Sequence, residues 1–133
     1  AYKTPLFNED IAPVAAPGLL KSGPGWTELP RIALSGPRPG WSERAGRFGT
    51  PTTPLPVLRF DTFAPALAAA RAGHGVLLAS LPLCNSDLEA GHLLRACDDS
   101  LSWHETYWLL GAREAVSRHQ WKQLETVLKA PVV

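Results

Sequence analysis

The chain has 133 residues, a hydrophobic content of 45% and a formal net charge of +1, with 13 Lys and Arg against 12 Asp and Glu. This length and composition suit a single globular core. The charges are scattered, which argues against the concentrated basic face that binds nucleic-acid phosphates. No apolar run is long enough to span a bilayer and no segment has the layout of a signal peptide, so we expect a cytoplasmic protein. Cys84 and Cys97 could form a disulfide only if the fold brought them together, and we expect both to be reduced thiols.

The first part of the chain is predicted to contain short elements separated by turns. Ile11–Ala16 is apolar enough for a strand, and Pro17–Leu20 is typical of a short helical turn, which a Ser-Gly-Pro-Gly step ends. A second turn at Trp26–Leu29 leads into the apolar strand Arg31–Ser35. These segments predict two strands separated by turns.

A segment rich in Pro, Gly and Arg, Gly36–Pro54, follows the second strand. It shows no clear period, which predicts a long loop. Arg38, Arg44 and Arg47 form a local basic cluster beside Trp41. A solvated loop explains these charges better than a contact with phosphate or an acidic ligand.

The central stretch predicts a strand, a capped helix, a glycine turn and a buried strand in one unit. Leu55–Phe60 is the first strand, and Asp61 or Thr62 can cap the helix by accepting hydrogen bonds from its first backbone N–H groups. The apolar face of this helix contains Phe63, Leu67 and Ala70, and Gly73 ends the helix. Its N-terminus suits a carboxylate or another anion, but a βαβ unit with ordinary caps explains the pattern equally well.

The remaining elements complete an alternation of strands and helices. Leu81–Leu88 is predicted as a helix, His92–Ala96 as a strand, Trp103–Leu110 as a later strand, and Ser117–Leu128 as the last helix. This order predicts an α/β fold with a mainly parallel sheet. Ligands in such sheets bind at the carboxyl ends of the strands, where Ser35, Phe60-Asp61-Thr62 and Ser80 are placed.

Several segments together resemble the effector-binding domain of LysR-type transcriptional regulators. The resemblance covers most of the chain. Trp41 and Phe48, ahead of the Phe-Asp-Thr step, look most like the branch of the glycine-cleavage and β-lactamase regulators. The matching segments are Leu6–Pro17, Phe60-Asp61-Thr62, Ala68-Ala69-Ala70, Ala72–Leu78, Asp87–Leu94, Glu105–Leu110 and Ser117–Leu128.

The resemblance implies an α/β architecture of the periplasmic-binding-protein-like (type 2) class, with two subdomains and a cleft between them. Residues 1–12 would supply part of the first subdomain and the crossing strand, 13–102 the second, effector-binding subdomain, and 103–133 the return strand and last helix of the first. The second subdomain would be nearly complete. The first would be partial, because the segment that builds most of it precedes Leu6 in the family.

The function implied by the resemblance is sensing, not catalysis. A small, anionic metabolite would bind between the subdomains, with the Thr62 hydroxyl and the N–H groups of Thr62 and Phe63 holding its anionic group. Asp61 would mainly cap the helix, and Ser35 and Tyr107 would add hydrogen bonds, although Tyr107 can equally be half-buried core. The full-length regulator would be a homo-oligomer that binds DNA through a helix-turn-helix domain outside this chain, with no membrane contact and no cofactor.

Other functions find less support in the residues. Cys84, His92, Cys97 and His104 have spacings that fit no closed zinc site. Ser35 lacks the glycine pattern of a nucleophile elbow, and neither a P-loop nor a dinucleotide fingerprint occurs. A solute-binding protein of a transporter, with the same cleft architecture, and a module that serves assembly alone remain the alternatives.

Overall fold

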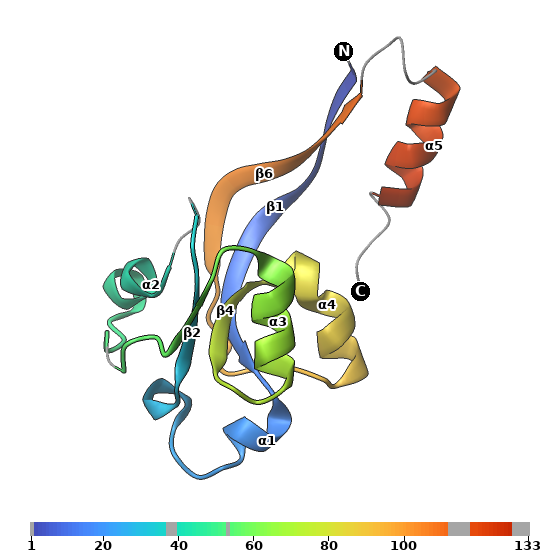
Figure 1. The fold of residues 1–133 in the computed structure, drawn as a ribbon. Helices are drawn as coiled ribbons and strands as arrows, with labels where there is room; N and C mark the ends of the chain where they lie inside the picture. Colours follow the sequence, from blue (N-terminus) through green and yellow to red (C-terminus); the bar gives the residue numbers. More distant parts are fainter. Residues whose placement is uncertain (1, 37–39, 53, 112–117, 129–133) are drawn as a thin grey trace.

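The computed structural model contains a six-stranded sheet with helices packed against it (Figure 1). The model describes residues 2–36, 40–52, 54–111 and 118–128, and of these the side chains of residues 2–8, 103–111, 125 and 128 lie outside the description. The strands are ordered β3-β2-β4-β1-β5, with β6 also paired to β1. Their bounds are β1 Tyr2–Ala15, β2 Arg31–Leu34, β3 Leu58–Phe60, β4 Val76–Ser80, β5 Leu94–Arg95 and β6 Leu101–Gly111.

Strand direction differs from the expected mainly parallel sheet. The pairs β2–β3 and β2–β4 are parallel, but β1 is antiparallel to β4, β5 and β6. Five strands therefore run one way and β1 alone runs the other way. Helical connections such as those before β4 and β5 keep successive strands pointing in one direction, whereas nothing in the local pattern of β1 encodes its direction.

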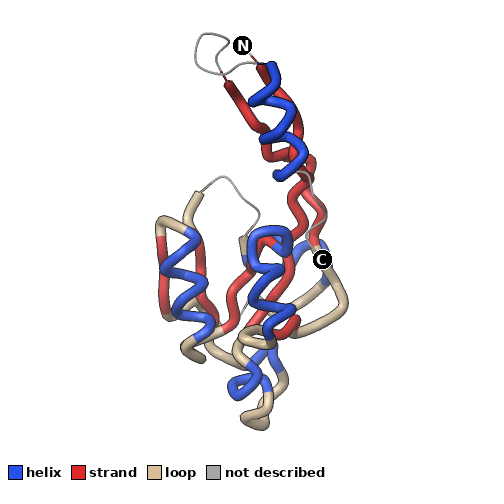
Figure 2. The backbone as a smooth tube through the Cα atoms, turned by 90° about the vertical axis from the view of Figure 1, so that its right-hand side faces the viewer, coloured by secondary structure: helices blue, strands red, loops and turns tan. Residues whose placement is uncertain are grey.

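The β1 and β6 strands form a long ribbon that leaves the main sheet. Their pairing runs from Ile11 opposite Leu101 to Tyr2 opposite Gly111, with two register shifts on the way. Figure 2 shows this ribbon projecting beyond the rest of the chain, with α5 (Arg118–Leu128) at its far end. Trp121 of α5 is buried.

The main core lies between the sheet and two helices, α3 (Phe63–Arg71) and α4 (Leu81–Ala90), which are drawn to the right of β4 in Figure 1. All five residues of β4 are buried, because it lies between β2 and β1 in the centre of the sheet. Buried residues that make up this core are Val14, Ile32, Ala66, Ala70, Leu77, Ala79, Cys84 and Leu93.

A smaller core forms under the first turns of the chain. Ala15, Leu29 and Val76 are its buried members, and side chains from α1 (Pro17–Leu20) and η1 (Trp26–Glu28) pack against them. These short elements appear where the sequence placed turns. Within the described residues, no helix is long and apolar enough to cross a membrane.

The prediction of a loop over Gly36–Pro54 is wrong for eight of these residues, because they form helix α2 (Trp41–Phe48). The side chain of Glu43 accepts a hydrogen bond from the Gly40 N–H at 2.8 Å, and Gly49 ends the helix with φ +67°. Arg44 is only 1% exposed, so the basic residues are not a solvated cluster as expected. Arg47 is exposed, and Arg38 lies outside the described residues.

Candidate functional site

The carboxyl ends of β2 and β3 bring predicted site residues together. The Ser35 N–H, just after β2, donates a hydrogen bond to the Phe60 carbonyl at the end of β3, with N and O 2.8 Å apart. Asp61 and Thr62 follow Phe60 directly, and both are exposed, as is Ser35. Parallel pairing of neighbouring strands thus places three of the five predicted side chains along one edge of the sheet.

The N-terminus of α3 has a different capping pattern from the one expected. Thr62 is the N-cap, with extended φ −128° and ψ 154°, but no side chain makes a capping hydrogen bond there. The expectation that Asp61 or Thr62 caps the helix is therefore wrong. Both side chains are exposed to solvent, which removes the pressure to form an internal cap. Phe63 is half-buried and packs against the main core, where it anchors the first turn.

Tyr107, the fifth predicted site residue, lies in β6, where its backbone is opposite Phe7 of β1. Its side chain is outside the described residues, so its contact with a ligand stays a prediction. The backbone pairing alone places it in the ribbon of β1 and β6.

Ser80 lies at the end of β4. The sequence predicted this position at a strand end, but Ser80 was not among the predicted ligand-binding residues. It is 2% exposed, and its Oγ atom is buried with no hydrogen-bond partner among the described residues. Ser80 is also the N-cap of α4, again without a side-chain capping bond. The signal that identifies it is a serine that directly follows four apolar strand residues.

A small cavity of about 40 Å³ lies beside Ser80, between the sheet and the start of α2. A wider, open cleft of about 270 Å³ adjoins it. The cavity is lined by Ile11, Ile32, Ala33, Leu34, Gly40, Trp41, Leu78 and Ser80. The cleft shares four of these residues, Ala33, Leu34, Gly40 and Trp41, and adds Ser42, Glu43, Thr52, Leu55, Pro56 and Arg59. Ser35, Asp61, Thr62 and Phe63 line neither space. Ser35, Asp61 and Thr62 are exposed to solvent, whereas Phe63 packs against the main core.

Trp41 forms the wall that the cavity and the cleft share, and hydrogen bonds fix its position. Its indole N–H donates to the Ile32 carbonyl at 2.9 Å, which ties α2 to β2. The Arg31 guanidinium lies 4.8 Å from the Trp41 ring and donates to the Pro51 and Thr27 carbonyls at 3.0 and 3.2 Å. Burial lowers the pKa of Arg31 from its ordinary value, and these carbonyl bonds replace part of the lost hydration.

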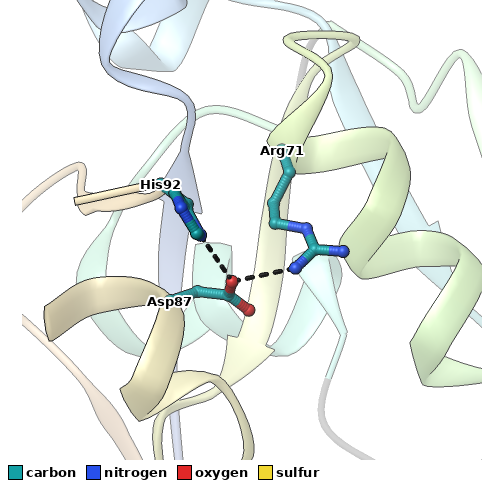
Figure 3. Close-up of polar contacts among 3 residues, drawn as sticks. All are labelled: Arg71, Asp87 and His92. Carbon is teal, nitrogen blue, oxygen red and sulfur yellow. Dashed lines mark hydrogen bonds and ion pairs between the residues drawn. The ribbon is translucent and has the colours of Figure 1, made fainter. Parts of the chain in front are cut away.

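A second polar cluster, formed by Arg71, Asp87 and His92, ties the C-terminal ends of α3 and α4 together (Figure 3). Asp87 is 7% exposed, and its Oδ1 lies 3.0 Å from Arg71 Nη1 and 3.3 Å from His92 Nδ1. Burial of Asp87 alone would raise its pKa, but hydrogen bonds from Arg71 and His92 outweigh burial and hold the pKa below its ordinary value. This cluster lies at the opposite helix ends from Thr62 and Ser80 and links α3 to α4.

The two cysteines are both free thiols. The part of the chain that the structure describes contains no group of three or more His, Cys, Asp or Glu residues able to hold a metal ion. His74 lies in the turn after α3, where its N–H donates to the Ala69 carbonyl at 3.1 Å.

Several solved structures share the fold of this chain. The effector binding domain of AmpR from Citrobacter freundii has a TM-score of 0.76 at 22% identity, over 98% of this chain and 68% of that one. The effector domain of AmpR from Pseudomonas aeruginosa gives 0.73 at 20% identity, over 96% and 65%. Full-length LysG from Corynebacterium glutamicum with bound effector Arg gives 0.61 at 19% identity, over 97% and 46%.

These likenesses show the fold of the chain. It is the α/β, periplasmic-binding-protein-like fold of LysR-type effector-binding domains, as the sequence predicted. No protein-family model matches the sequence, and no curated protein is significantly similar to it. The chain spans about two thirds of the two AmpR domains and less than half of the full-length regulator.

Proposed function

We propose that this chain is the effector-sensing part of a LysR-type transcription regulator, and that it acts as a sensor and not as an enzyme. The observation that carries the proposal is the match of 96–98% of the chain to two effector domains at TM-scores of 0.73 and 0.76. The same architecture serves solute-binding proteins of transporters, but the similar structures described above are regulators.

The ligand in this proposal is a small metabolite with a carboxylate group. The N-terminus of α3 supports this, because its first N–H groups have no side-chain cap and carry the positive end of the helix dipole. The Thr62 hydroxyl and the N–H groups of Thr62 and Phe63 would bind the carboxylate. Ser35 and Tyr107 would add hydrogen bonds, and Asp61 would disfavour ligands that present a second negative charge there.

An amino acid is one ligand of this class. LysG binds the effector Arg, and an amino acid carries a carboxylate for the start of α3 as well as a cationic amino group for Asp61. Because Asp61 is exposed beside Thr62, it lies within the same edge of the sheet. This pairing of charges would favour amino acids over dicarboxylates.

The proposed mechanism is a population shift between two arrangements of the subdomains. Residues 13–102 would form the second subdomain, and residues 1–12 and 103–133 would belong to the first. The β1–β6 ribbon, which projects from the main sheet, supports this division. Within the described residues, it is the one part of the sheet that extends toward α5 (Figure 2). A ligand held in the cleft would change the relative angle, and the oligomeric full-length protein would alter its grip on DNA in the cytoplasm.

The substitution Thr62→Val tests the site directly, because it removes the hydroxyl and keeps the shape of the side chain. We expect ligand affinity to fall by about 1–3 kcal/mol, measured by calorimetric titration with the L-amino acid that most raises the melting temperature. Thr126→Val, at an exposed position of α5, is the matched control and should bind as the wild type does. An unchanged affinity in Thr62→Val removes Thr62 from the site.

A further inference from the structure

A buried guanidinium without a carboxylate partner lies in α2. Arg44 is 1% exposed, and its guanidinium lies 4.6 Å from the Phe48 ring and 5.5 Å from the Trp26 ring. Its Nη2 donates a hydrogen bond to the Cys97 Sγ at 3.1 Å. Its Nε and Nη1 atoms have no partner within the described part of the chain.

The arrangement leaves hydrogen-bond donors of Arg44 unused. Aromatic faces stabilise a cation but accept no strong hydrogen bonds, and a thiol sulfur is a weak acceptor. A buried donor without a partner is unfavourable, because it has lost its hydrogen bonds to water. The site would therefore gain from an oxygen placed on or next to the Cys97 sulfur.

Cys97 is less buried than the second cysteine, Cys84. It is partly exposed, in the segment that follows β5, and its sulfur is 3.7 Å from the Asp99 carbonyl oxygen. Cys84 is fully buried in the main core, and burial raises the pKa of its thiol to about 11. Cys97 is therefore the candidate for reaction, and Cys84 is a buried reference thiol in the same chain.

We propose that Cys97 is a site of oxidation by hydroperoxides, at which Arg44 binds the oxygen that the sulfur acquires. The sulfur attacks the terminal peroxide oxygen, so an S–O bond forms and the O–O bond breaks. Sulfur loses two electrons, the peroxide gains them, and the leaving alkoxide or hydroxide takes the thiol proton to give an alcohol or water. The product is a sulfenic acid, whose oxygen accepts hydrogen bonds from Arg44.

This oxidation would connect two parts of the fold near the cavity. Arg44 belongs to the helix that begins with Trp41, which forms the shared wall, while Cys97 follows β5. A sulfenate bound by Arg44 would hold these segments together more firmly than the thiol does. The inference concerns this chemistry alone and does not depend on the proposed effector.

Dimedone trapping with peptide mass spectrometry tests the inference on the whole 133-residue chain treated with hydrogen peroxide. We expect Cys97 to be labelled at least about tenfold faster than Cys84. Arg44→Met should slow the labelling of Cys97 several-fold in a chain whose circular dichroism matches the wild type. Arg47→Met, at an exposed position of the same helix, should leave it unchanged.

A measurement on the unaltered chain covers the case in which Arg44→Met does not fold. We expect Cys97 to be labelled faster in the native chain than in 8 M urea, even though unfolding exposes the sulfur more, because unfolding removes Arg44. Faster labelling in urea overturns the inference, and so does equal labelling of Cys97 in wild type and a folded Arg44→Met.

Discussion

The carboxylate of Asp87 is held by the guanidinium of Arg71 at 3.0 Å, which joins the last residue of α3 to α4. The backbone of Asp87 contributes as well, because its carbonyl accepts hydrogen bonds from the N–H groups of His92 at 3.0 Å and Leu93 at 3.3 Å. Asp87 thus accepts hydrogen bonds from the segment that follows α4 and also links α4 to α3 (Figure 3).

Asp87→Asn should destabilise the fold in a pH-dependent way. The pKa of Asp87 is held below its ordinary value in the folded chain, so its contribution to stability is present above the ordinary carboxyl range and is lost as the pH falls through the folded pKa. Because Arg71 is half exposed, we expect a loss of about 1 kcal/mol at pH 7 and a smaller loss at pH 3. Urea unfolding at both pH values measures it.

The control for Asp87→Asn is Glu89→Gln, on the exposed side of the same helix, which should change the free energy of unfolding little at either pH. An equal loss for Asp87→Asn at pH 7 and pH 3 would show that the ionised carboxylate is not what stabilises the fold.

Gly75→Ala should destabilise the junction between the α3 turn and β4. A Cβ atom at this position would lie 3.0 Å from both the Pro30 carbonyl oxygen and the Ile32 Cγ1, and the first is backbone that cannot move aside cheaply. We expect a loss of about 1–3 kcal/mol in the free energy of unfolding, measured in urea.

The control for Gly75→Ala is Gly46→Ala in α2, where a Cβ atom would meet nothing within 4 Å. Alanine should stabilise this helical position by up to about 1 kcal/mol. If the two variants are equally stable, the close approach of Pro30 to Gly75 is not a real constraint.

Ser80→Ala should leave the fold as stable as the wild type or raise the free energy of unfolding by about 0.5–1 kcal/mol, since it deletes a buried hydroxyl without a described partner. Thermal and urea unfolding measure the change. A loss larger than 1 kcal/mol would instead mean that the hydroxyl has a partner, such as a water molecule in the adjoining cavity of about 40 Å³.

Cys84 should resist alkylation in the native chain. Its pKa is raised to about 11 by burial in the main core, with a smaller contribution from the negative charge of Asp87. Because the thiolate is the nucleophile, iodoacetamide at pH 8 should modify Cys97 and spare Cys84, as peptide mass spectrometry can determine. Alkylation of both residues at one rate would contradict the burial of Cys84.

Local sequence signals predicted most elements because they lie within a few residues of the structure they control. The alanine-rich helix before Gly73 and the glycine turn into β4 are examples, since Gly73 adopts φ +85° where the helix ends. The strand order, the reversed direction of β1 and the two-residue length of β5 depend on pairing with distant segments, which a single sequence does not reveal.

The helix α2 shows how distant contacts override local composition. Gly, Pro and Arg around it favour a loop, but Arg44 packs between Phe48 and Trp26, and Trp26 lies far outside the segment. Once that contact forms, Trp41, Arg44 and Phe48 share one buried helix face.

The positions of Ser35 and Thr62 at strand ends were predictable from the sequence, but the missing cap and the burial of Ser80 were not. Alternating strands and helices correctly placed Ser35 and Thr62 at neighbouring strand ends. The missing cap at Thr62 depends on solvent exposure, and the burial of Ser80 depends on pairing of β4 with β1, opposite Ile11. Neither can be read from spacing along the chain.

The most direct test of the central claim is the melting temperature of this chain with and without millimolar L-amino acids and dicarboxylic acids, with native mass measured in parallel. A sensor predicts that one compound class raises the melting temperature in proportion to the logarithm of its concentration, and that Thr62→Val reduces the rise at each concentration. A well-folded chain whose melting temperature no compound changes would contradict the account.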